Sequence, residues 1–385
     1  MKVALISTFF SPVVGGMESI VADLAIELKK QGLEVEVLTT NSNRNSQVLN
    51  SAAHLEDWNG ITVKRAPVMF HLTEFHKFSP ALYSLIARSD ADVFHVHGLR
   101  KLEGYWAQLI AKLNGKKIIL STHNPFTVNE RSTSQKLFIF LSDLLLGKLW
   151  LRFVDKFIVL SETEISKLQK LYGIKLENMV QINNAINDVF FAESKADRTK
   201  VLNELGIVLT KSTSKMVLSI GRLHKVKGFQ NLLQAAMQNP EVNFVVVGGD
   251  GGYLEELKKL SSEIANFYIV DRFFSQTELA KLMSSADLFV FPSLHEPFGL
   301  LLVEAMASKL PVIATASGGP EEILDNGKYG VLVPADNTSA LADAIKNVLA
   351  SNEASTYKEL AKVRAKDFSW QNVIAQYLAV YQETK

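Results

Sequence analysis

The chain alternates short apolar runs, rich in β-branched residues, with longer segments of helical periodicity. In its first half the runs include residues 3–8 (VALIST), 92–98 (DVFHVHG) and 117–123 (KIILSTH), and helical segments occupy residues 17–32 and 104–115. Most of the runs lack polar alternation, which is typical of strands buried on both faces. Because helices separate the strands, the pattern predicts an α/β fold built on a parallel sheet.

The same alternation starts again near residue 216. The runs at residues 216–221 (MVLSIG), 243–249 (NFVVVGG) and 288–293 (LFVFPS) predict a second doubly wound domain. Between the halves, residues 187–214 are largely polar and their periodicity is weak. A length of 385 residues suits two domains, so we predict a first domain at 1–190 and a second at 191–368.

Composition narrows the possible functions. The 41 Lys and Arg residues against 40 Asp and Glu give a net charge of +1, so no overall field favours nucleic acid. The absence of cysteine excludes a disulfide, a thiolate zinc site and a cysteine nucleophile. The first residues lack the cleavage pattern of an export signal, so we expect a cytoplasmic protein.

One apolar segment, residues 137–154, raises the question of a membrane. It contains Asp143, Lys148 and Arg152, and a spanning helix rarely buries three charges. The segment fits a helix lying on the inner face of a bilayer, near a lipid-linked acceptor, and it fits a buried helix equally well. Peripheral membrane contact therefore stays a hypothesis.

Two further patterns bear on metals and nucleotides. Asp90 and Asp92 form an Asp-x-Asp pair, but they precede a predicted strand and so belong to the edge of the sheet away from ligands. We predict a role in the loop for them and no metal site. The sequence contains no phosphate-binding P-loop, no zinc-protease motif and no hydrolase nucleophile elbow.

Residues that follow strands are the candidates for a ligand site, because ligands of open α/β sheets bind beyond the carboxyl ends of the strands. Gly15 and Gly16 follow the first strand and open a helix, where bare N–H groups can approach an anion. Gly221, Arg222 and Lys227 hold the equivalent place in the second half, and their charges suit a diphosphate without a metal. Each group alone also fits an ordinary turn, whereas both together favour a diphosphate site.

Other strand ends carry weaker signals. The turn at residues 248–252, which contains Gly249, allows a ligand to approach the backbone closely. His97 and His123 end two neighbouring strands, although a histidine in such a place is often structural.

Two glutamates surround the segment that follows strand 288–293. Glu296 comes directly after the strand, and Glu304 lies within a helix that begins near Phe298. Carboxylates accept hydrogen bonds from hydroxyls, and sugars are arrays of hydroxyls. The pair predicts a ligand with two sugar rings; a capping Glu and a surface Glu are the plainer alternative.

Taken together, these motifs resemble those of the retaining glycosyltransferases of family 4. The resemblance covers essentially the whole chain, from VVGGMESIVADLA through HVHG, STHN, GRLHKVKGF, VVGGDGG and EPFGLLLVE to ASGGPEEIL. It implies the GT-B architecture, in which two Rossmann-like domains face each other across a cleft. It also implies that the last helix, predicted at residues 369–385, returns to the first domain.

The resemblance implies a role for each matching residue. Arg222 and Lys227 would bind the donor diphosphate in place of a metal, and no cofactor is expected. Glu296 would hold hydroxyls of the transferred sugar, and His123 would reach the same sugar from the first domain. Glu304 would bind the ribose. The remaining donor contacts would come from glycines and from the start of the helix: Gly15, Gly16, Gly221, Gly249, Phe298, Gly299 and Leu300.

The implied reaction moves a sugar from a UDP-, GDP- or ADP-sugar to a hydroxyl of a glycan or of a lipid-linked acceptor. A hydrolase would need one carboxylate as acid and another as base or nucleophile across the bond, whereas here the glutamates are assigned to binding. A nucleotide-sugar 2-epimerase and a non-catalytic nucleotide-sugar-binding module are the alternatives. The base, the transferred sugar, the acceptor and the oligomeric state stay open.

Overall fold

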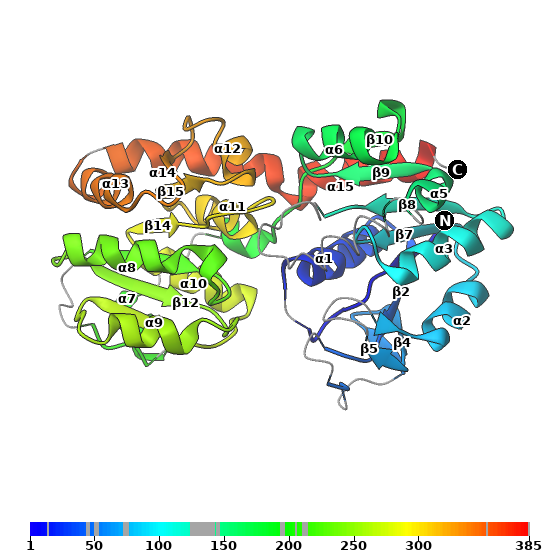
Figure 1. Ribbon diagram of the computed structural model, residues 1–385, viewed down its shortest axis with the longest axis horizontal. Coiled ribbons are helices and arrows are strands. Elements are labelled where there is room, and N and C mark those ends of the chain that lie inside the picture. Colours follow the sequence, from blue (N-terminus) through cyan, green and yellow to red (C-terminus); the bar gives the residue numbers. More distant parts are fainter. Residues whose placement is uncertain are drawn as a thin grey trace. The chain divides into compact units, whose positions relative to one another are not determined.

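The computed structural model describes residues 1–13, 15–43, 47–49, 54–71, 77–123, 143, 147–192, 197–204, 206–209, 215–351 and 353–383. The chain forms two compact units (Figure 1). Unit 1 consists of Met1–Asn184 with Val373–Lys385, and unit 2 consists of Ala185–Asn372. Each unit is built around its own sheet, as the repeated alternation predicts.

Unit 1 contains an eight-stranded sheet. In spatial order its strands are β10 (Met179–Gln181), β9 (Lys156–Val159), β8 (Lys117–Ser121), β7 (Val93–His97), β1 (Lys2–Ile6), β2 (Glu34–Thr40), β4 (Ile61–Ala66) and β3 (Leu55–Trp58). The first seven pair in parallel, which confirms the predicted α/β class. A two-stranded hairpin, β5 (Phe70–His71) with β6 (Lys77–Phe78), lies outside this sheet.

Strand β3 departs from the predicted pattern, because it pairs antiparallel with β4. A two-residue turn joins the two strands, and both of its residues have positive φ: 54° at Asn59 and 74° at Gly60. This backbone geometry suits the tight hairpin turns for which Asn-Gly is the preferred sequence. The turn adds an antiparallel edge to an otherwise parallel sheet.

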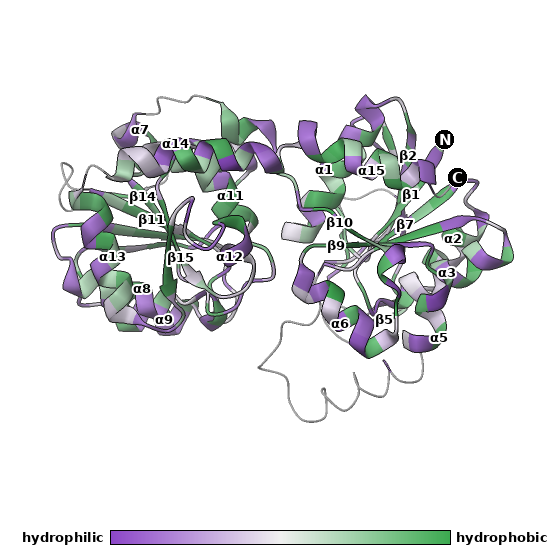
Figure 2. Ribbon diagram, turned by 90° about the horizontal axis from the view of Figure 1, so that it is seen from above, coloured by the Kyte–Doolittle hydropathy of each residue, from purple (hydrophilic) through white to green (hydrophobic). Residues whose placement is uncertain are grey.

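Helices cover both faces of the unit 1 sheet (Figure 2). One face carries α1 (Gly16–Lys30) and α15 (Trp370–Glu383). The other carries α2 (Pro80–Arg88), α3 (Leu102–Leu113), α5 (Lys148–Trp150) and α6 (Glu162–Tyr172), with the short 3-10 turns η2 (Leu151–Phe153) and η3 (Leu176–Asn178) nearby in the sequence. Strand β1 is buried from Val3 to Ile6, which is why these residues show no polar alternation.

Unit 2 contains a six-stranded sheet whose strand pairs are all parallel. In spatial order the strands are β13 (Phe267–Val270), β12 (Asn243–Val247), β11 (Met216–Ile220), β14 (Leu288–Phe291), β15 (Val312–Ala316) and β16 (Val331–Pro334). One face carries α8 (Phe229–Gln238), α9 (Leu254–Ser261) and α13 (Thr338–Ala350), whose apolar side chains form one buried cluster with the strands.

The remaining helices of unit 2 complete its second face and its edges. They are α7 (Arg198–Glu204), α10 (Gln276–Ser285), α11 (Leu300–Ala307), α12 (Gly319–Ile323) and α14 (Glu353–Ala365), with the 3-10 turns η4 (Asp188–Phe191), η5 (Lys225–Lys227) and η6 (Lys366–Phe368). None of the helices in the described ranges is long and apolar enough to cross a membrane.

The boundary between the units lies earlier in the chain than residue 190, where we expected it. Residues from Ala185 onward belong to unit 2. The Ile186 N–H donates to the Phe368 carbonyl at 2.9 Å, and the Phe190 ring is 1% exposed. These residues are packed into unit 2, whereas the sequence shows them only as a weakly periodic stretch. The return to unit 1 likewise comes at Val373 and not at residue 369.

Candidate active site

Four loops follow the carboxyl ends of the adjacent strands β12, β11, β14 and β15 in unit 2. Backbone hydrogen bonds join them into one surface. The Leu223 N–H donates to the Gly249 carbonyl at 2.9 Å, and the Leu294 N–H donates to the Val226 carbonyl at 2.8 Å. The Glu296 N–H donates to the Ser317 carbonyl at 3.0 Å. The predicted donor residues of unit 2 lie on these loops or on the helix that follows β14.

Lys227 and Glu296 form an ion pair on this surface. The Lys227 Nζ lies 2.6 Å from the Glu296 Oε2, and the side chains are 22% and 12% exposed. The amine also lies 5.8 Å from the centre of the Phe291 ring. A pair this sheltered interacts more strongly than a fully exposed one, because water screens it less. Two of the residues predicted to bind the donor are thus in direct contact.

Arg222 is exposed, and no hydrogen bond or ion pair joins it to the part of the chain that the structure describes. Its aliphatic stem lies against the glycine turn after β12. A Cβ built on Gly251 would be only 2.7 Å from the Arg222 Cγ, so Gly251 leaves room for the stem. The guanidinium of Arg222 remains available for a ligand anion. Arg222 lies five residues before Lys227, on the same loop after β11.

Gly249 lies beneath the ring of Phe273, which is not among the residues predicted for the site. A Cβ on Gly249 would meet the Phe273 ring at 2.5 Å, and Phe273 is 63% exposed. An exposed aromatic face on a glycine turn is suited to planar ligand groups. The aromatic pair FF, at residues 273–274 just after β13, was the available sequence signal.

Helix α11 begins at Leu300, close to the predicted start. Gly299 caps it with φ at 113°, a value that favours glycine. The first N–H groups of a helix have no partners within the helix and therefore face outward for a ligand. Phe298 packs edge-on against Phe368, with ring centres 5.8 Å apart, and Glu304 lies half-buried further along the same helix.

In unit 1 the predicted residue His123 ends a group of three imidazoles. The His123 Nε2 lies 3.1 Å from the His97 Nδ1, and the rings of His95 and His97 are 4.2 Å apart. Burial lowers the pKa of His95 to about 3 and that of His123 to about 4. Burial, together with the repulsion that a protonated His97 would meet from protonated His95 or His123, holds the pKa of His97 well below its usual value. All three rings are therefore neutral at neutral pH.

Gly16 opens α1 as predicted, with Gly15 at its N-cap. Strands β1, β7 and β8 are neighbours in the sheet, so the loops that carry Gly16, Gly98 and His123 share one edge of unit 1. A Cβ on Gly98 would lie 3.7 Å from the Met17 Sδ, which places the start of α1 beside the loop after β7. Unit 1 thus gathers its own predicted residues at the carboxyl ends of its strands.

Two family models match the chain, one for each unit. The model described as Glycosyltransferase Family 4 matches residues 14–190, and the model described as Glycosyl transferases group 1 matches residues 203–365. The chain is a family 4 glycosyltransferase. The resemblance inferred from its motifs is confirmed.

Relatives of this glycosyltransferase align along its whole length. D-inositol 3-phosphate glycosyltransferase of Corynebacterium glutamicum (strain R) is 26% identical, with 100% of this chain and 97% of that protein covered. GDP-mannose:cellobiosyl-diphosphopolyprenol alpha-mannosyltransferase of Xanthomonas oryzae pv. oryzae (strain PXO99A) is 25% identical, with 100% and 97% covered. The solved structure of Anabaena HepE in complex with UDP and glucose has a TM-score of 0.78 at 19% identity, with 100% of both chains covered, and supports the GT-B fold.

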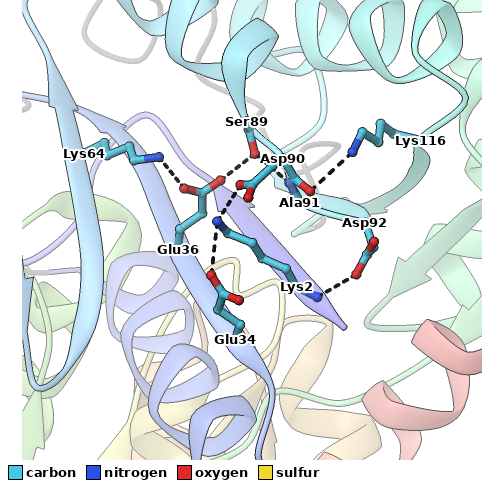
Figure 3. A network of polar contacts seen from close by, with 9 residues as sticks. All are labelled: Lys2, Glu34, Glu36, Lys64, Ser89, Asp90, Ala91, Asp92 and Lys116. Atoms are coloured by element: carbon cyan, nitrogen blue, oxygen red, sulfur yellow. Dashed lines mark hydrogen bonds and ion pairs between the residues drawn. The ribbon is translucent and has the colours of Figure 1, made fainter.

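In this glycosyltransferase, ion pairs occupy the edge of the unit 1 sheet at the amino ends of its strands, opposite the edge that carries Gly16 and His123 (Figure 3). The Lys2 Nζ contacts Asp90 at 2.5 Å and Glu34 at 3.1 Å, and the backbone N–H of Lys2 donates to Asp92 at 2.8 Å. The interpretation of Asp90 and Asp92 as loop residues agrees with these contacts. The described ranges contain no group of three or more His, Asp or Glu residues that could hold a metal ion.

A cavity of about 300 Å³ lies at this same amino-terminal edge, lined by residues such as Lys2, Lys29, Glu36 and Lys64. Their amines are already engaged: Lys29 donates to the Gly60 carbonyl at 2.8 Å, and Lys64 contacts Glu36 at 2.6 Å. None of the residues that line this cavity belongs to the candidate site. Of the apolar segment at 137–154, residue 143 and residues 147–154 lie within the described part, so the hypothesis of a peripheral membrane helix concerns a segment of which half lies outside the described residues.

Proposed function

We propose that the enzyme is a retaining, metal-independent transferase that moves a sugar from a nucleotide-diphosphate sugar to a hydroxyl acceptor. The observation that carries this proposal is the Lys227–Glu296 pair, 2.6 Å apart on the four-loop surface that also carries the exposed Arg222. Cations beside a carboxylate suit a ligand that joins a diphosphate to a hydroxyl-rich ring. The resemblance supports the same assignment.

Arg222 and Lys227 are assigned to the donor diphosphate. As the bond from the sugar C1 to the phosphate oxygen breaks, negative charge grows on the diphosphate, and fixed cations stabilise it most in the transition state. The two side chains would take the place of a divalent metal. Glycines 221 and 249 would let the donor approach the backbone.

Glu296 is assigned to hydroxyls of the transferred sugar, and Glu304 to the ribose. Backbone N–H groups at Phe298, Gly299 and Leu300, around the start of α11, are assigned to further contacts with the donor. From unit 1, His123 is assigned to the sugar, and Gly15 and Gly16 to the phosphates. In the front-face substitution that the resemblance implies, the acceptor oxygen bonds to C1 as the phosphate oxygen leaves, and the acceptor proton passes to that oxygen.

The comparisons support a nucleotide-sugar donor and leave its base open. The Anabaena protein is described with UDP and glucose, and the Xanthomonas relative is named for GDP-mannose. The named acceptors of the relatives, D-inositol 3-phosphate and cellobiosyl-diphosphopolyprenol, share hydroxyl groups and phosphate. We therefore propose a glycan, a polyol or a lipid-linked sugar as acceptor, with peripheral membrane contact in the lipid-linked case.

Thermal unfolding with UDP, GDP, ADP and their sugar conjugates tests the donor site. A ligand at about 100 times its dissociation constant adds roughly 2.7 kcal/mol to the native state. We expect one nucleotide family to stabilise the chain selectively, and Glu304→Ala to weaken that effect. No shift with any nucleotide at millimolar concentration would reject the donor site.

Product analysis then separates transfer from the alternatives. With an acceptor present, we expect a new glycoside and free nucleotide diphosphate. Conversion of the donor to its epimer without an acceptor would identify an epimerase. Donor binding without turnover across an acceptor panel would instead favour a binding module.

Replacing Gly251 with alanine is expected to weaken donor binding about tenfold, the size of one charge-assisted hydrogen bond. The new Cβ would lie 2.7 Å from the Arg222 Cγ and 2.9 Å from the Leu223 carbonyl oxygen, so the turn and the Arg222 side chain would have to move apart. Isothermal titration with the preferred nucleotide measures the change. Gly252→Ala is the matched control, because a Cβ at Gly252 meets nothing within 4 Å although φ is +91°. Equal affinities in the two variants would contradict the role given to Gly251.

Replacing Glu296 with glutamine is expected to change binding and turnover in opposite directions. The loss of the carboxylate leaves Lys227 without its negative partner at 2.6 Å, so the free nucleotide diphosphate should bind several-fold more tightly. Turnover should fall about 10²-fold, because the sugar loses a charged hydrogen-bond acceptor. Titration and steady-state kinetics measure the two effects. Weaker nucleotide binding in Glu296→Gln would contradict the pairing argument.

A further inference from the structure

Three imidazoles, those of His95, His97 and His123, lie near the carboxyl ends of β7 and β8. Their contacts limit which ring nitrogens can carry a proton. His97 is fully buried, and its Nδ1 lies 3.1 Å from the His123 Nε2. The other ring nitrogen of His97, Nε2, is buried without a hydrogen-bond partner in the described part of the chain. His95 does not supply one, because its Nδ1 lies 2.7 Å from the Tyr381 hydroxyl and its Nε2 lies 2.8 Å from the Ser121 hydroxyl.

The unpartnered nitrogen decides where the proton of His97 resides. A neutral imidazole carries one proton, on either Nδ1 or Nε2. A buried N–H donor without a partner is rarer and more costly than a buried acceptor without one. The His97 proton therefore belongs on Nδ1, and Nε2 keeps the lone pair.

This choice fixes the state of His123 as well. If the His97 Nδ1–H donates, the His123 Nε2 accepts and carries no proton. A neutral His123 then holds its proton on Nδ1. Both rings stay neutral because burial opposes the imidazolium form, and the charge of Lys101 opposes it further at His123.

The backbone of His123 supports a constrained, functional placement. Its φ is +54°, in the left-handed region that residues other than glycine rarely adopt. Such a conformation costs free energy and persists where the surrounding structure holds it. The strain sets the ring at the end of β8 in contact with His97.

We propose that His97 is a positioning residue that holds His123 in the tautomer with its proton on Nδ1. His123 then acts on the transferred sugar as a hydrogen-bond donor and not as a proton acceptor, since its Nε2 is engaged by His97. This inference rests on the proposed function, in which His123 reaches the donor sugar. A donor sugar lacking the oxygen that His123 contacts would be a poor substrate, because the N–H of His123 would lose its partner.

The tautomer can be observed directly in the full chain. Two-bond ¹H–¹⁵N spectra of protein labelled with ¹⁵N-histidine distinguish the two neutral forms, and the His123→Asn variant assigns the signals of His123. We expect His123 protonated on Nδ1 in the parent chain. His123 protonated on Nε2 would overturn the proposal, whether or not the enzyme turns over any sugar.

Two substitutions at His97 then separate positioning from packing. Asparagine keeps an N–H donor near the place of Nδ1, whereas phenylalanine keeps a ring and removes the donor. We expect His97→Asn to keep the His123 tautomer and stay within about threefold of the parent kcat, and His97→Phe to lose the tautomer and about tenfold in kcat. The parent tautomer and kcat in His97→Phe would overturn the proposal.

Nucleotide-induced stabilisation distinguishes this failure from failure of the proposed function. Its expected contacts on unit 2 are untouched by either variant, so the shift in unfolding temperature should persist in both. If no nucleotide raised the unfolding temperature of the parent chain, the donor site would be rejected. The spectrum of the parent chain would still determine the tautomer of His123. If His97→Phe did not fold, the parent spectrum together with His97→Asn would still decide.

Discussion

Replacing Lys227 with alanine is expected to lower kcat by roughly 10²–10³-fold, by analogy with the loss of a single preorganised donor at an oxyanion site. The Lys227 amine is held 2.6 Å from Glu296 and 5.8 Å from the Phe291 ring centre, so it is fixed before any donor arrives. A fixed cation stabilises growing negative charge without reorganising during the reaction. The KM for the donor should change less than kcat, because the charge is largest in the transition state. Steady-state kinetics with the preferred donor measure both parameters.

Lys225 provides the matched control, since it lies in the same 3-10 turn. Its amine pairs with Glu256 at 2.9 Å, and its side chain is 57% exposed. Exposed pairs contribute little, so Lys225→Ala should keep kcat within about twofold. Equal losses of kcat in the two variants would show that either positive charge in the turn contributes equally to turnover. That result would contradict the specific role of Lys227.

Replacing Gly228 with alanine is expected to destabilise unit 2 by roughly 3–5 kcal/mol, which places it among the severe single substitutions. Two effects combine at this residue. Its φ is +71°, which costs any L side chain, and a Cβ would lie 1.9 Å from the Pro292 carbonyl oxygen. That oxygen belongs to backbone and cannot swing away as a flexible side chain can. The unfolding midpoint should fall by on the order of 10 °C.

Gly206→Ala separates the two effects. Gly206 also lies in unit 2, its φ is +69°, and a Cβ added there would meet no described atom within 4 Å. This control should lose only the roughly 1–2 kcal/mol of the left-handed conformation. If Gly228→Ala were no less stable than Gly206→Ala, the loops after β11 and β14 would be less tightly packed than the contact implies.

The fold followed from features that are local in the sequence. Apolar runs without alternation identified the parallel strands, because burial on both faces leaves no polar side. The antiparallel β3 was missed although Asn59-Gly60 is a strong hairpin signal, since LEDW is too polar to appear as a strand. The domain boundary was misplaced because Phe190 packs into unit 2, and the weakly periodic residues around it in the sequence do not indicate this packing.

The candidate site was predictable in place but not in detail. The rule that ligands bind at the carboxyl ends of strands directed attention to Arg222, Lys227 and Glu296. The contact between Lys227 and Glu296 joins residues 69 positions apart, and no local pattern encodes it. The exposure of Phe273 and the pairing of His97 with His123 likewise depend on tertiary structure.

The last helix of the chain has a consequence for synthesis. Helix α15 supplies residues from Val373 onward to unit 1, and its Tyr381 hydroxyl contacts the buried His95. A ribosome therefore releases all of unit 2 before it releases the element that completes unit 1. Domains usually fold in the order in which they emerge, the amino-terminal one first. Here the amino-terminal sheet must wait with one face partly uncovered, so the nascent chain should finish folding its second domain before its first.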